Sequence, residues 1–329
     1  MRRFYFFLTA LWVFFAAGCS DDNHATHEEP GTGPGRIDLA VTGRVGTLVD
    51  ENLTEYVKSL DLLLFRENDN GIYLLAQSVS FTKDEIEDLT SGNTESEAGF
   101  TKSRTVNFEN LPLGSYEIVG VGNIRDSVGG VLGNASLSGV NVGNTMKEVL
   151  ASITAGEVSP RLFFGTTSPI VLGTTEAANP SLLLFRKVAM FSLTLEKVPV
   201  SVREIDVQIQ NTYGAFDMTG DFLSNRIIGV EQQKSYIFTE NQPSLSLALI
   251  TLPSATPAGS QITLVFRLDN GQVITIPLEK QYVLKANTIT KLTATIDANQ
   301  SGGVWSVELS VSISADVEWN VDQEPNIII

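Results

Sequence analysis

Residues 305–321 constrain the fold of this chain more than any other stretch of its sequence. Apolar and polar residues alternate there without a break, from Trp305 to Val321. Such alternation is typical of a β-strand with one face buried and one face in water, as in the antiparallel sheets of β-sandwiches. A single strand of this length would exceed the usual one. We therefore expect the segment to bend or to pair with two successive neighbours.

Shorter strand patterns fill much of the remaining chain and are separated by turn signals. The first strand presents apolar residues on one parity, namely Ile37, Leu39, Val41 and Val45. Residues 57–65 (VKSLDLLLF) form a denser apolar run. Asn-Gly at 70–71 and Asp-Asn-Gly at 269–271 predict hairpin turns, since Asn and Gly tolerate the positive φ angles of tight turns. The sequence therefore predicts an all-β chain of tandem antiparallel β-sandwich domains.

Two short segments within this β pattern favour helices. Residues 82–89 (TKDEIEDL) are acidic and compatible with a solvated helix. Residues 145–153 are a second candidate, which Gly156 would end.

The length of the chain, 329 residues, predicts more than one core. Turn-forming residues at 166–169 (TTSP) suggest a boundary near the middle. We expect an N-terminal β-sandwich over residues 36–168 and a C-terminal β-sandwich over residues 169–329.

The N-terminus reads as a secretory signal followed by an attachment point for lipid. Arg2 and Arg3 precede an apolar run, and small residues then lead into Cys19, the one cysteine of the chain. The run is too short to span a bilayer, and Ala-Ala-Gly before Cys19 resembles the bacterial lipobox. We expect a signal peptide over residues 1–18, a lipid on Cys19, and a flexible tether over residues 19–35. Anchoring in this way takes two or more acyl chains.

Composition excludes several classes of function. The net charge of −16 argues against binding to nucleic acid. Both histidines, His24 and His27, lie in the tether, so the predicted domains lack the residues of Ser-His-Asp and Cys-His catalysis and of most zinc sites. We therefore expect a protein that is not an enzyme, with no metal and no cofactor beyond the covalent lipid.

Four segments resemble the FimB-type fimbrial anchor and accessory subunits of the Bacteroides–Porphyromonas group. They are residues 57–65 (VKSLDLLLF), 111–123 (LPLGSYEIVGVGN), 161–166 (RLFFGT) and 286–297 (ANTITKLTATID). The resemblance implies two transthyretin-like Greek-key sandwiches and a lipoprotein of the outer membrane that joins other fimbrial subunits through β-strands. Residues 20–22 (SDD) resemble the signal that sends Bacteroides lipoproteins to the cell surface. Host or bacterial surface molecules are further partners that this resemblance suggests.

The same resemblance indicates which residues would take part in strand exchange. Related subunits are thought to lose their first strand by cleavage after an arginine, and a strand of a neighbour then fills the groove. We expect the strand carrying Ile37, Leu39, Val41 and Val45 to be retained here, as in an anchor. The C-terminal Ile327, Ile328 and Ile329 are candidates for engaging a neighbour, although a frayed terminus is the simpler interpretation. Arg36 and Arg44 flank the strand, and cleavage after either would instead release a polymerising stalk or tip subunit.

Two other interpretations come from different functional classes. A surface lipoprotein that binds glycans would use sandwich loops and aromatic residues, with Trp305 and Trp319 as candidates. Their parity places them with the apolar set, which favours core packing. A glycosidase with two paired carboxylates ranks last, because a chain with 38 acidic residues offers many accidental pairs.

Overall fold

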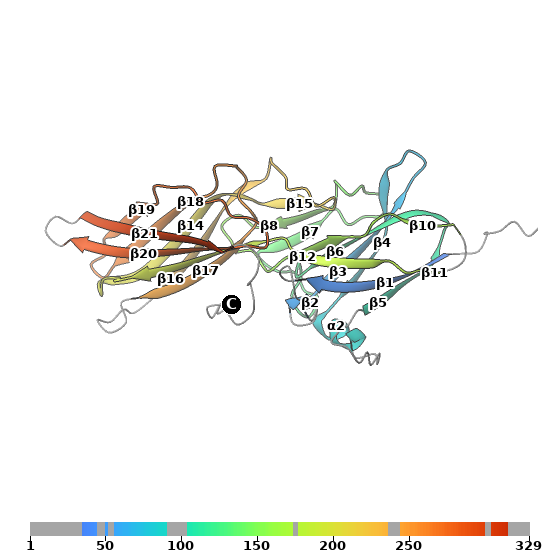
Figure 1. Cartoon of the computed structure of the whole chain (residues 1–329), viewed down its shortest axis with the longest axis horizontal. Coiled ribbons are helices and arrows are strands. Elements are labelled where there is room, and N and C mark those ends of the chain that lie inside the picture. The colour runs from blue at the N-terminus through green and yellow to red at the C-terminus, as the bar shows by residue number, and fades with distance from the viewer. Residues whose placement is uncertain are drawn as a thin grey trace, which may run out of the picture.

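The protein is an elongated, nearly all-β molecule of two sandwiches joined end to end (Figure 1). The computed structural model describes residues 35–44, 50–51, 56–90, 104–173, 177–235, 244–299 and 304–314. Strands β1 to β12 build most of the half on the right of Figure 1, and β13 to β21 most of the half on the left. The predicted all-β class with two sandwiches is confirmed.

One ten-stranded sheet, curled on itself, forms the N-terminal sandwich. Its main path runs β11-β1-β12-β9-β6-β3-β4, with β10 on β6 and with β2 and β5 on β1. The strands are β1 (Gly35–Arg44), β2 (Asp50–Glu51), β3 (Leu60–Glu67), β4 (Tyr73–Phe81), β5 (Arg104–Leu111), β6 (Gly114–Gly122), β9 (Phe163–Thr166), β10 (Ile170–Leu172), β11 (Ala177–Ala178) and β12 (Ser181–Arg186).

Two four-stranded sheets form the C-terminal sandwich, in the orders β17-β13-β20-β21 and β16-β14-β18-β19. The strands are β13 (Ala189–Glu196), β14 (Val202–Tyr213), β16 (Ile227–Ser235), β17 (Leu245–Thr251), β18 (Gln261–Leu268), β19 (Val273–Pro277), β20 (Ile289–Asn299) and β21 (Val304–Ser314). β21 carries the described part of the alternating segment and pairs with β20 along its whole length.

The two sandwiches repeat one topology. β1 pairs with β5 antiparallel and with β12 in parallel, just as β13 pairs with β17 antiparallel and with β20 in parallel. β3 lies between β4 and β6, just as β14 lies between β16 and β18. The two sandwiches thus share one strand order, in which β1 and β13 hold equivalent central positions. Most pairings are antiparallel, and the exceptions are β1–β11, β1–β12 and β13–β20.

The two sandwiches differ in whether a strand pairs with both of their faces. In the N-terminal sandwich, β9 pairs with both β12 and β6 and so joins the two faces. Gly165 in β9 makes this possible, because a Cβ there would lie 2.2 Å from the backbone oxygen of Leu183 in β12. In the C-terminal sandwich, the second neighbour of β20 is β21 instead.

A small third sheet crosses between the two halves. β7 (Ala135–Ser138) and β8 (Leu150–Ile153) follow β6 in sequence, and β15 (Ala215–Asp217) comes from the C-terminal half to pair with β8. The helix predicted over residues 145–153 was therefore wrong. Thr145 and Glu148 form a single turn closed by the Glu148 carboxylate, which accepts hydrogen bonds from the backbone N–H and hydroxyl of Thr145 at 2.7 and 2.9 Å. The chain then enters β8, where alternate side chains are buried.

The other predicted helix is confirmed as α2 (Lys83–Thr90). Thr82 and Glu85 form a capping box at its start. The Glu85 carboxylate accepts from the Thr82 backbone N–H at 2.7 Å, and the Glu85 backbone N–H donates to the Thr82 hydroxyl at 3.4 Å. Both predicted hairpin turns are present as well, with Gly71 and Gly271 at φ angles of 74° and 81°.

The strand pairings indicate which strands belong to each half of the molecule. We propose a division between β12 and β13, later in the chain than the boundary expected at residues 168–169. β10, β11 and β12 follow the earlier boundary in sequence but pair with β6 and β1 of the N-terminal sheet.

A shared hydrophobic core joins the two halves. Each sandwich has a core of its own. A third cluster combines residues of the N-terminal half, such as Phe65 and Val121, with residues of the C-terminal half, such as Met190 and Ile250. Because apolar burial is the main favourable term in folding, the two sandwiches support one another across the junction.

Candidate strand-exchange site

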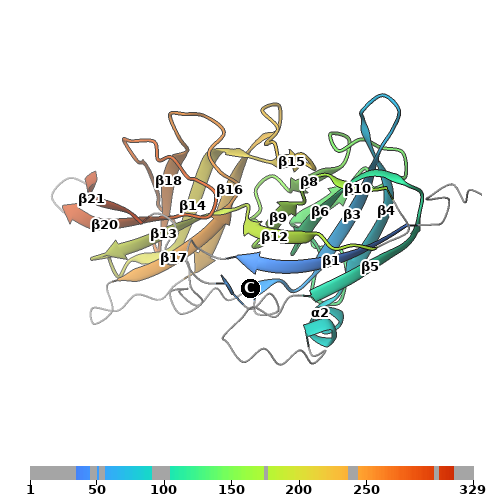
Figure 2. The ribbon, with the colours of Figure 1, turned by 45° about the vertical axis from the view of Figure 1, so that its right-hand side comes forward.

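Strand β1 lies in the interior of the N-terminal sandwich. Its backbone pairs with β5 on one side and with β12 on the other, as Figure 2 shows. The side chains of Ile37, Leu39 and Val41 are all 0% exposed. They pack in the core that β3, β6 and β12 also line. The period-two pattern of the sequence therefore places three of the predicted exchange residues on one buried face.

The energy of this burial makes β1 hard to remove without a replacement. Complete burial of an aliphatic side chain is worth about 1.5–3 kcal/mol, so the three side chains contribute about 5–9 kcal/mol. The net stability of a typical domain is about 5–15 kcal/mol. Loss of β1 would also leave the facing edges of β5 and β12 without their backbone hydrogen bonds. A sandwich without β1 would therefore need another strand in the same groove.

The two arginines flank the buried part of β1. Arg36 is exposed and its guanidinium Nε lies 2.5 Å from the carboxylate Oδ1 of Asp38. Arg44 is the last residue of β1, where its backbone pairs with Phe185 of β12 and Asp50 of β2. Cleavage after Arg36 would leave Ile37, Leu39 and Val41 in the chain, whereas cleavage after Arg44 would detach all three.

Several predicted site residues lie outside the described part of the chain. They are Cys19, Val45, Ile327, Ile328 and Ile329. Lipidation and the role of the C-terminal isoleucines therefore stay predictions.

Sequence reasoning did not identify β5 and β12 as the strands that pair with β1. β12 brings Leu182 and Leu184 into the same core, and β5 brings Val106 and Phe108. A signal was present in residues 181–186 (SLLLFR), which form an apolar run. The sequence pattern identified a strand there but gave no sign that it pairs with a strand so distant along the chain.

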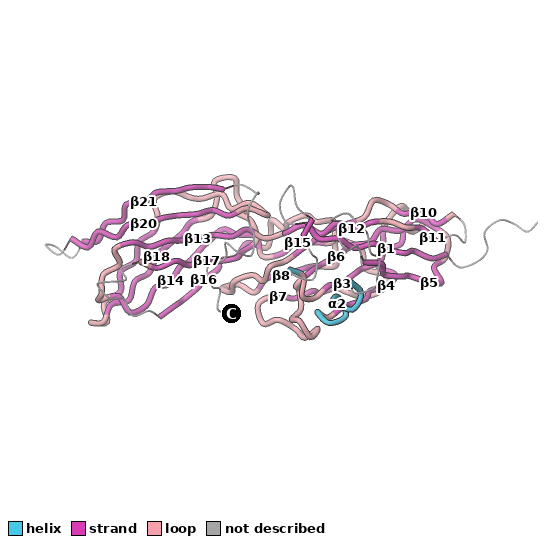
Figure 3. Tube along the Cα trace, turned by 60° about the horizontal axis from the view of Figure 1, so that its bottom comes forward, coloured by secondary structure: helices cyan, strands magenta, loops and turns pink. Residues whose placement is uncertain are grey.

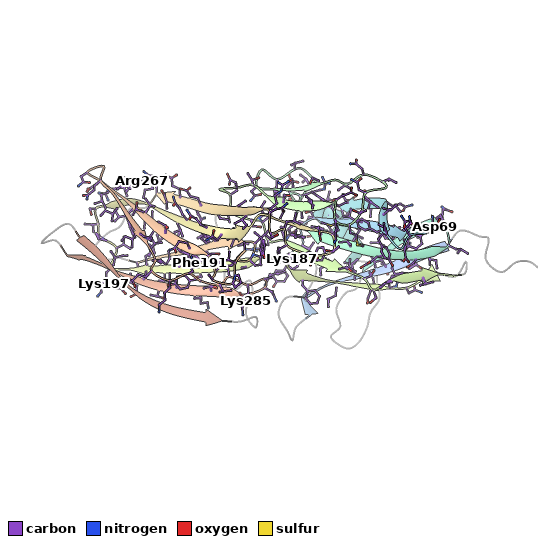
Figure 4. All side chains as sticks on the ribbon, turned by 90° about the horizontal axis from the view of Figure 1, so that it is seen from above. Asp69, Lys187, Phe191, Lys197, Arg267 and Lys285 are labelled. Atoms are coloured by element: carbon purple, nitrogen blue, oxygen red, sulfur yellow. The ribbon has the colours of Figure 1, made fainter. Side chains whose placement is uncertain are left out.

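A half-buried cation lies at the junction of the two sandwiches, where Figure 4 labels Lys187. Its ammonium group donates to the backbone oxygen of Gly220 at 2.6 Å. The rings of Phe164, Phe216 and Phe222 surround it, with centroids 5.0, 5.4 and 4.4 Å from Nζ. Burial lowers the pKa of Lys187, and the carboxylates of Asp221 and Asp217 oppose that shift. Lys187 thus contacts both the loop after β15, through Gly220 and Phe222, and β9 of the N-terminal half, through Phe164.

Within the described residues, groups that could hold a metal ion were sought among His, Cys, Asp and Glu, and none was found. The described helices likewise include none with the length and apolar character needed to cross a bilayer.

Comparisons with known proteins place the chain among related proteins. A search of the curated proteins found no match. Among solved structures, the fimbrial anchor protein Mfa2 from Porphyromonas gingivalis is 14% identical, with a TM-score of 0.54, over 84% of this chain and 98% of that one. A candidate adhesin from Bacteroides ovatus is 16% identical, with a TM-score of 0.55, over 87% of this chain and 96% of that one.

A third structure, of a candidate polysaccharide-binding protein from Bacteroides thetaiotaomicron, is 13% identical, with a TM-score of 0.56. The match covers 87% of this chain and 99% of that one. At these identities the three structures establish a shared fold. The family is established by a match to the family model over residues 28–324, which covers nearly the whole chain. The chain belongs to the family of fimbrillin-A associated anchor proteins Mfa1 and Mfa2.

Proposed function

We propose that this protein is an outer-membrane lipoprotein that acts as a fimbrial anchor or accessory subunit. A lipid on Cys19 holds it at the cell surface, and it joins other fimbrial subunits by β-strand addition. It works by pairing backbones and not by catalysis. The observation that carries the proposal is β1, which fills its own groove with three fully buried side chains.

An anchor and a polymerising subunit differ in what fills the groove between β5 and β12. A subunit that receives a strand from a neighbour needs this groove emptied by cleavage, whereas an anchor keeps β1 there, paired as it is in the uncut chain. Arg44 ends β1, so a cut after this residue would convert the chain into a subunit able to accept a strand.

The shape of the molecule suits an anchor held by its N-terminus. The start of β1 lies at one end of the long axis, and the hairpin of β20 and β21 extends to the other end (Figure 1). A lipid on Cys19 would place the N-terminal sandwich near the membrane and this hairpin farther out.

The experiment is crosslinking and purification of the tagged protein from intact cells, comparing the natural chain with Cys19→Ser. The natural chain should be recovered from the outer membrane together with fimbrial subunits. Cys19→Ser should lose the membrane fraction while keeping its fold. Recovery of the natural chain without any fimbrial subunit would contradict the proposal.

A second candidate function is glycan binding at the cell surface. It is favoured by the likeness to the candidate polysaccharide-binding protein from Bacteroides thetaiotaomicron. A glycan array separates the two functions. Specific binding to a sugar by a protein that never purifies with fimbriae would favour this second function.

A further inference from the structure

β21 is an outer strand of its sheet, and among the described residues its second edge has no strand beside it. It pairs with β20 along all eleven of its residues. Figure 3 shows it at the border of the C-terminal sandwich, with no described strand beyond it. Such an edge presents a row of backbone donors and acceptors to any chain that approaches.

Other outer strands are covered by loops of the same chain. In β4, the backbone N–H of Leu75 donates to the oxygen of Asn144 at 2.7 Å. In β16, the N–H of Glu231 donates to the oxygen of Gly156 at 3.1 Å. In β17, the oxygen of Ile250 accepts from the N–H of Ser159 at 2.9 Å. Among the described backbone hydrogen bonds of turns and loops, none reaches β21.

Two further outer strands, β19 and β5, carry features that discourage pairing with another chain. β19 is five residues long and ends in Pro277, which has no N–H to donate. β5 is eight residues long, contains Arg104 and Glu109, and has α2 nearby in Figure 1. β21 is longer, contains no proline, lysine or arginine, and has Glu308 as its one charged residue. Natural edges of this kind are normally covered.

The sequence of β21 is complementary to itself in the antiparallel direction. If two copies of β21 pair about Leu309, then Val304 lies opposite Ser314 and every residue of the strand gains a partner. This register aligns apolar positions with apolar positions, Val307 with Val311 and Trp305 with Ile313. It also places Glu308 opposite Ser310 rather than opposite another Glu308. No like charges meet, although the chain carries a net charge of −16.

From these observations we infer that β21 is a homodimer interface, in which two copies of this chain pair their β21 edges antiparallel about Leu309. The dimer has two-fold symmetry, because one patch contacts the same patch of its partner. Its two four-stranded sheets join into one continuous sheet across the axis. This inference concerns β21 alone and stands independently of the lipid anchor and of the fimbrial role.

Cysteine crosslinking of the full chain in detergent tests the register. Ser306 and Ser312 lie opposite each other across the proposed axis, about 5 Å apart between Cβ atoms. Ser306→Cys and Ser312→Cys proteins, mixed and mildly oxidised, should form a disulfide dimer. Each variant alone should form none at these positions, since its own copies lie about 20 Å apart at 3.3 Å per residue. Mass analysis of the joined peptide identifies residues 306 and 312 and distinguishes them from Cys19.

Charge variants test the pairing without a covalent bond. Ser310→Glu places one carboxylate opposite Glu308 at each of the two symmetry-related contacts of the dimer, whereas Ser310→Lys places an ammonium there. Sedimentation should show association weakened about tenfold or more by Ser310→Glu and undiminished by Ser310→Lys. Glu308→Lys combined with Ser310→Glu should restore association. Circular dichroism of each variant checks that the sandwich remains folded.

Two results would overturn the inference. One is a monomer for the natural chain at every concentration, which would assign this edge to residues 315–329 or to a different subunit. The other is a dimer that responds equally to both charges at residue 310 and forms no disulfide between residues 306 and 312.

Discussion

Among single residues, Asp206 of the C-terminal sandwich has a buried carboxylate whose loss of hydration lowers the stability of the folded state. Asp206 in β14 is 1% exposed, and its Oδ2 accepts a hydrogen bond from Nη2 of Arg267 at 3.1 Å. Its Oδ1 is buried without a hydrogen-bond partner among the described residues. Burial raises the pKa of Asp206 above its ordinary value, Arg267 opposes the shift, and Glu204 and Glu231 add to it. The folded state therefore disfavours the charged form.

Asp206→Asn should make the protein slightly more stable at pH 7, by about 1 kcal/mol or less, because it removes a desolvated charge. The folded pKa is raised, so ionised Asp206 costs stability above that pKa, and the cost disappears as the pH falls toward about 3.8. The advantage of Asp206→Asn should therefore shrink between pH 7 and pH 4. Urea unfolding at both pH values measures it. Glu279→Gln, at an exposed carboxylate that is not among the groups shifting the Asp206 pKa, is the control. An advantage of Asp206→Asn that grows on acidification would contradict the prediction.

At the scale of elements, the sequence predicted strands better than it predicted their partners. Alternation located β1 because one face of the strand is buried. The same method could not show that β12 pairs with β1, since periodicity carries no information about long-range pairing. The error at residues 145–153 has a different cause. Thr145 and Glu148 give a genuine local helix-start signal, but the pairing of β8 with β7 and β15 outweighs it after one turn.

The candidate site was partly predictable for the same reason. Ile37, Leu39 and Val41 could be named from their parity, and all three are buried. The groove itself could not be predicted, because its walls come from β5 and β12, which lie far apart in the sequence. Lys187 could not be predicted either, since its three aromatic neighbours come together only in the folded chain.

Gly165→Ala should disrupt the contact between β9 and β12 that closes the N-terminal sandwich. The added Cβ would lie 2.2 Å from the backbone oxygen of Leu183, so the strands must separate. We expect a loss of stability of about 3 kcal/mol or more, at the upper end for overpacking, because a backbone atom cannot move aside like a side chain. Gly173→Ala is the matched control, since no atom lies within 4 Å of its added Cβ. Thermal unfolding that shows the same midpoint for both variants would contradict this description of the closure.

At the scale of the whole molecule, the core shared across the junction makes the two sandwiches one structural unit. Val121 of β6 and Ile250 of β17 belong to one buried cluster. At the junction, Lys187 also contacts the C-terminal half through a hydrogen bond to Gly220 and a cation–π contact with Phe222. A lipid at the N-terminus would then position the distant hairpin of β20 and β21 through a stiff body.

Unfolding should accordingly be a single cooperative transition. Trp305 and Trp319, the tryptophans outside the predicted signal peptide, both lie in the C-terminal half of the sequence, whereas circular dichroism reports on both sandwiches. The two signals should change together in urea. Fluorescence that changes at a clearly different urea concentration would mean that the halves unfold separately.

We propose that this chain keeps β1 and is held to the membrane by its N-terminus. Mass analysis of the N-terminal peptide of the protein, purified from its native membrane, tests both points most directly. We expect this peptide to begin at Cys19, to carry acyl chains, and to continue unbroken through Arg36 and Arg44. A mature N-terminus at Val45, with no fatty acid, would contradict it, because β1 would then be lost and the groove between β5 and β12 left for a strand of another subunit.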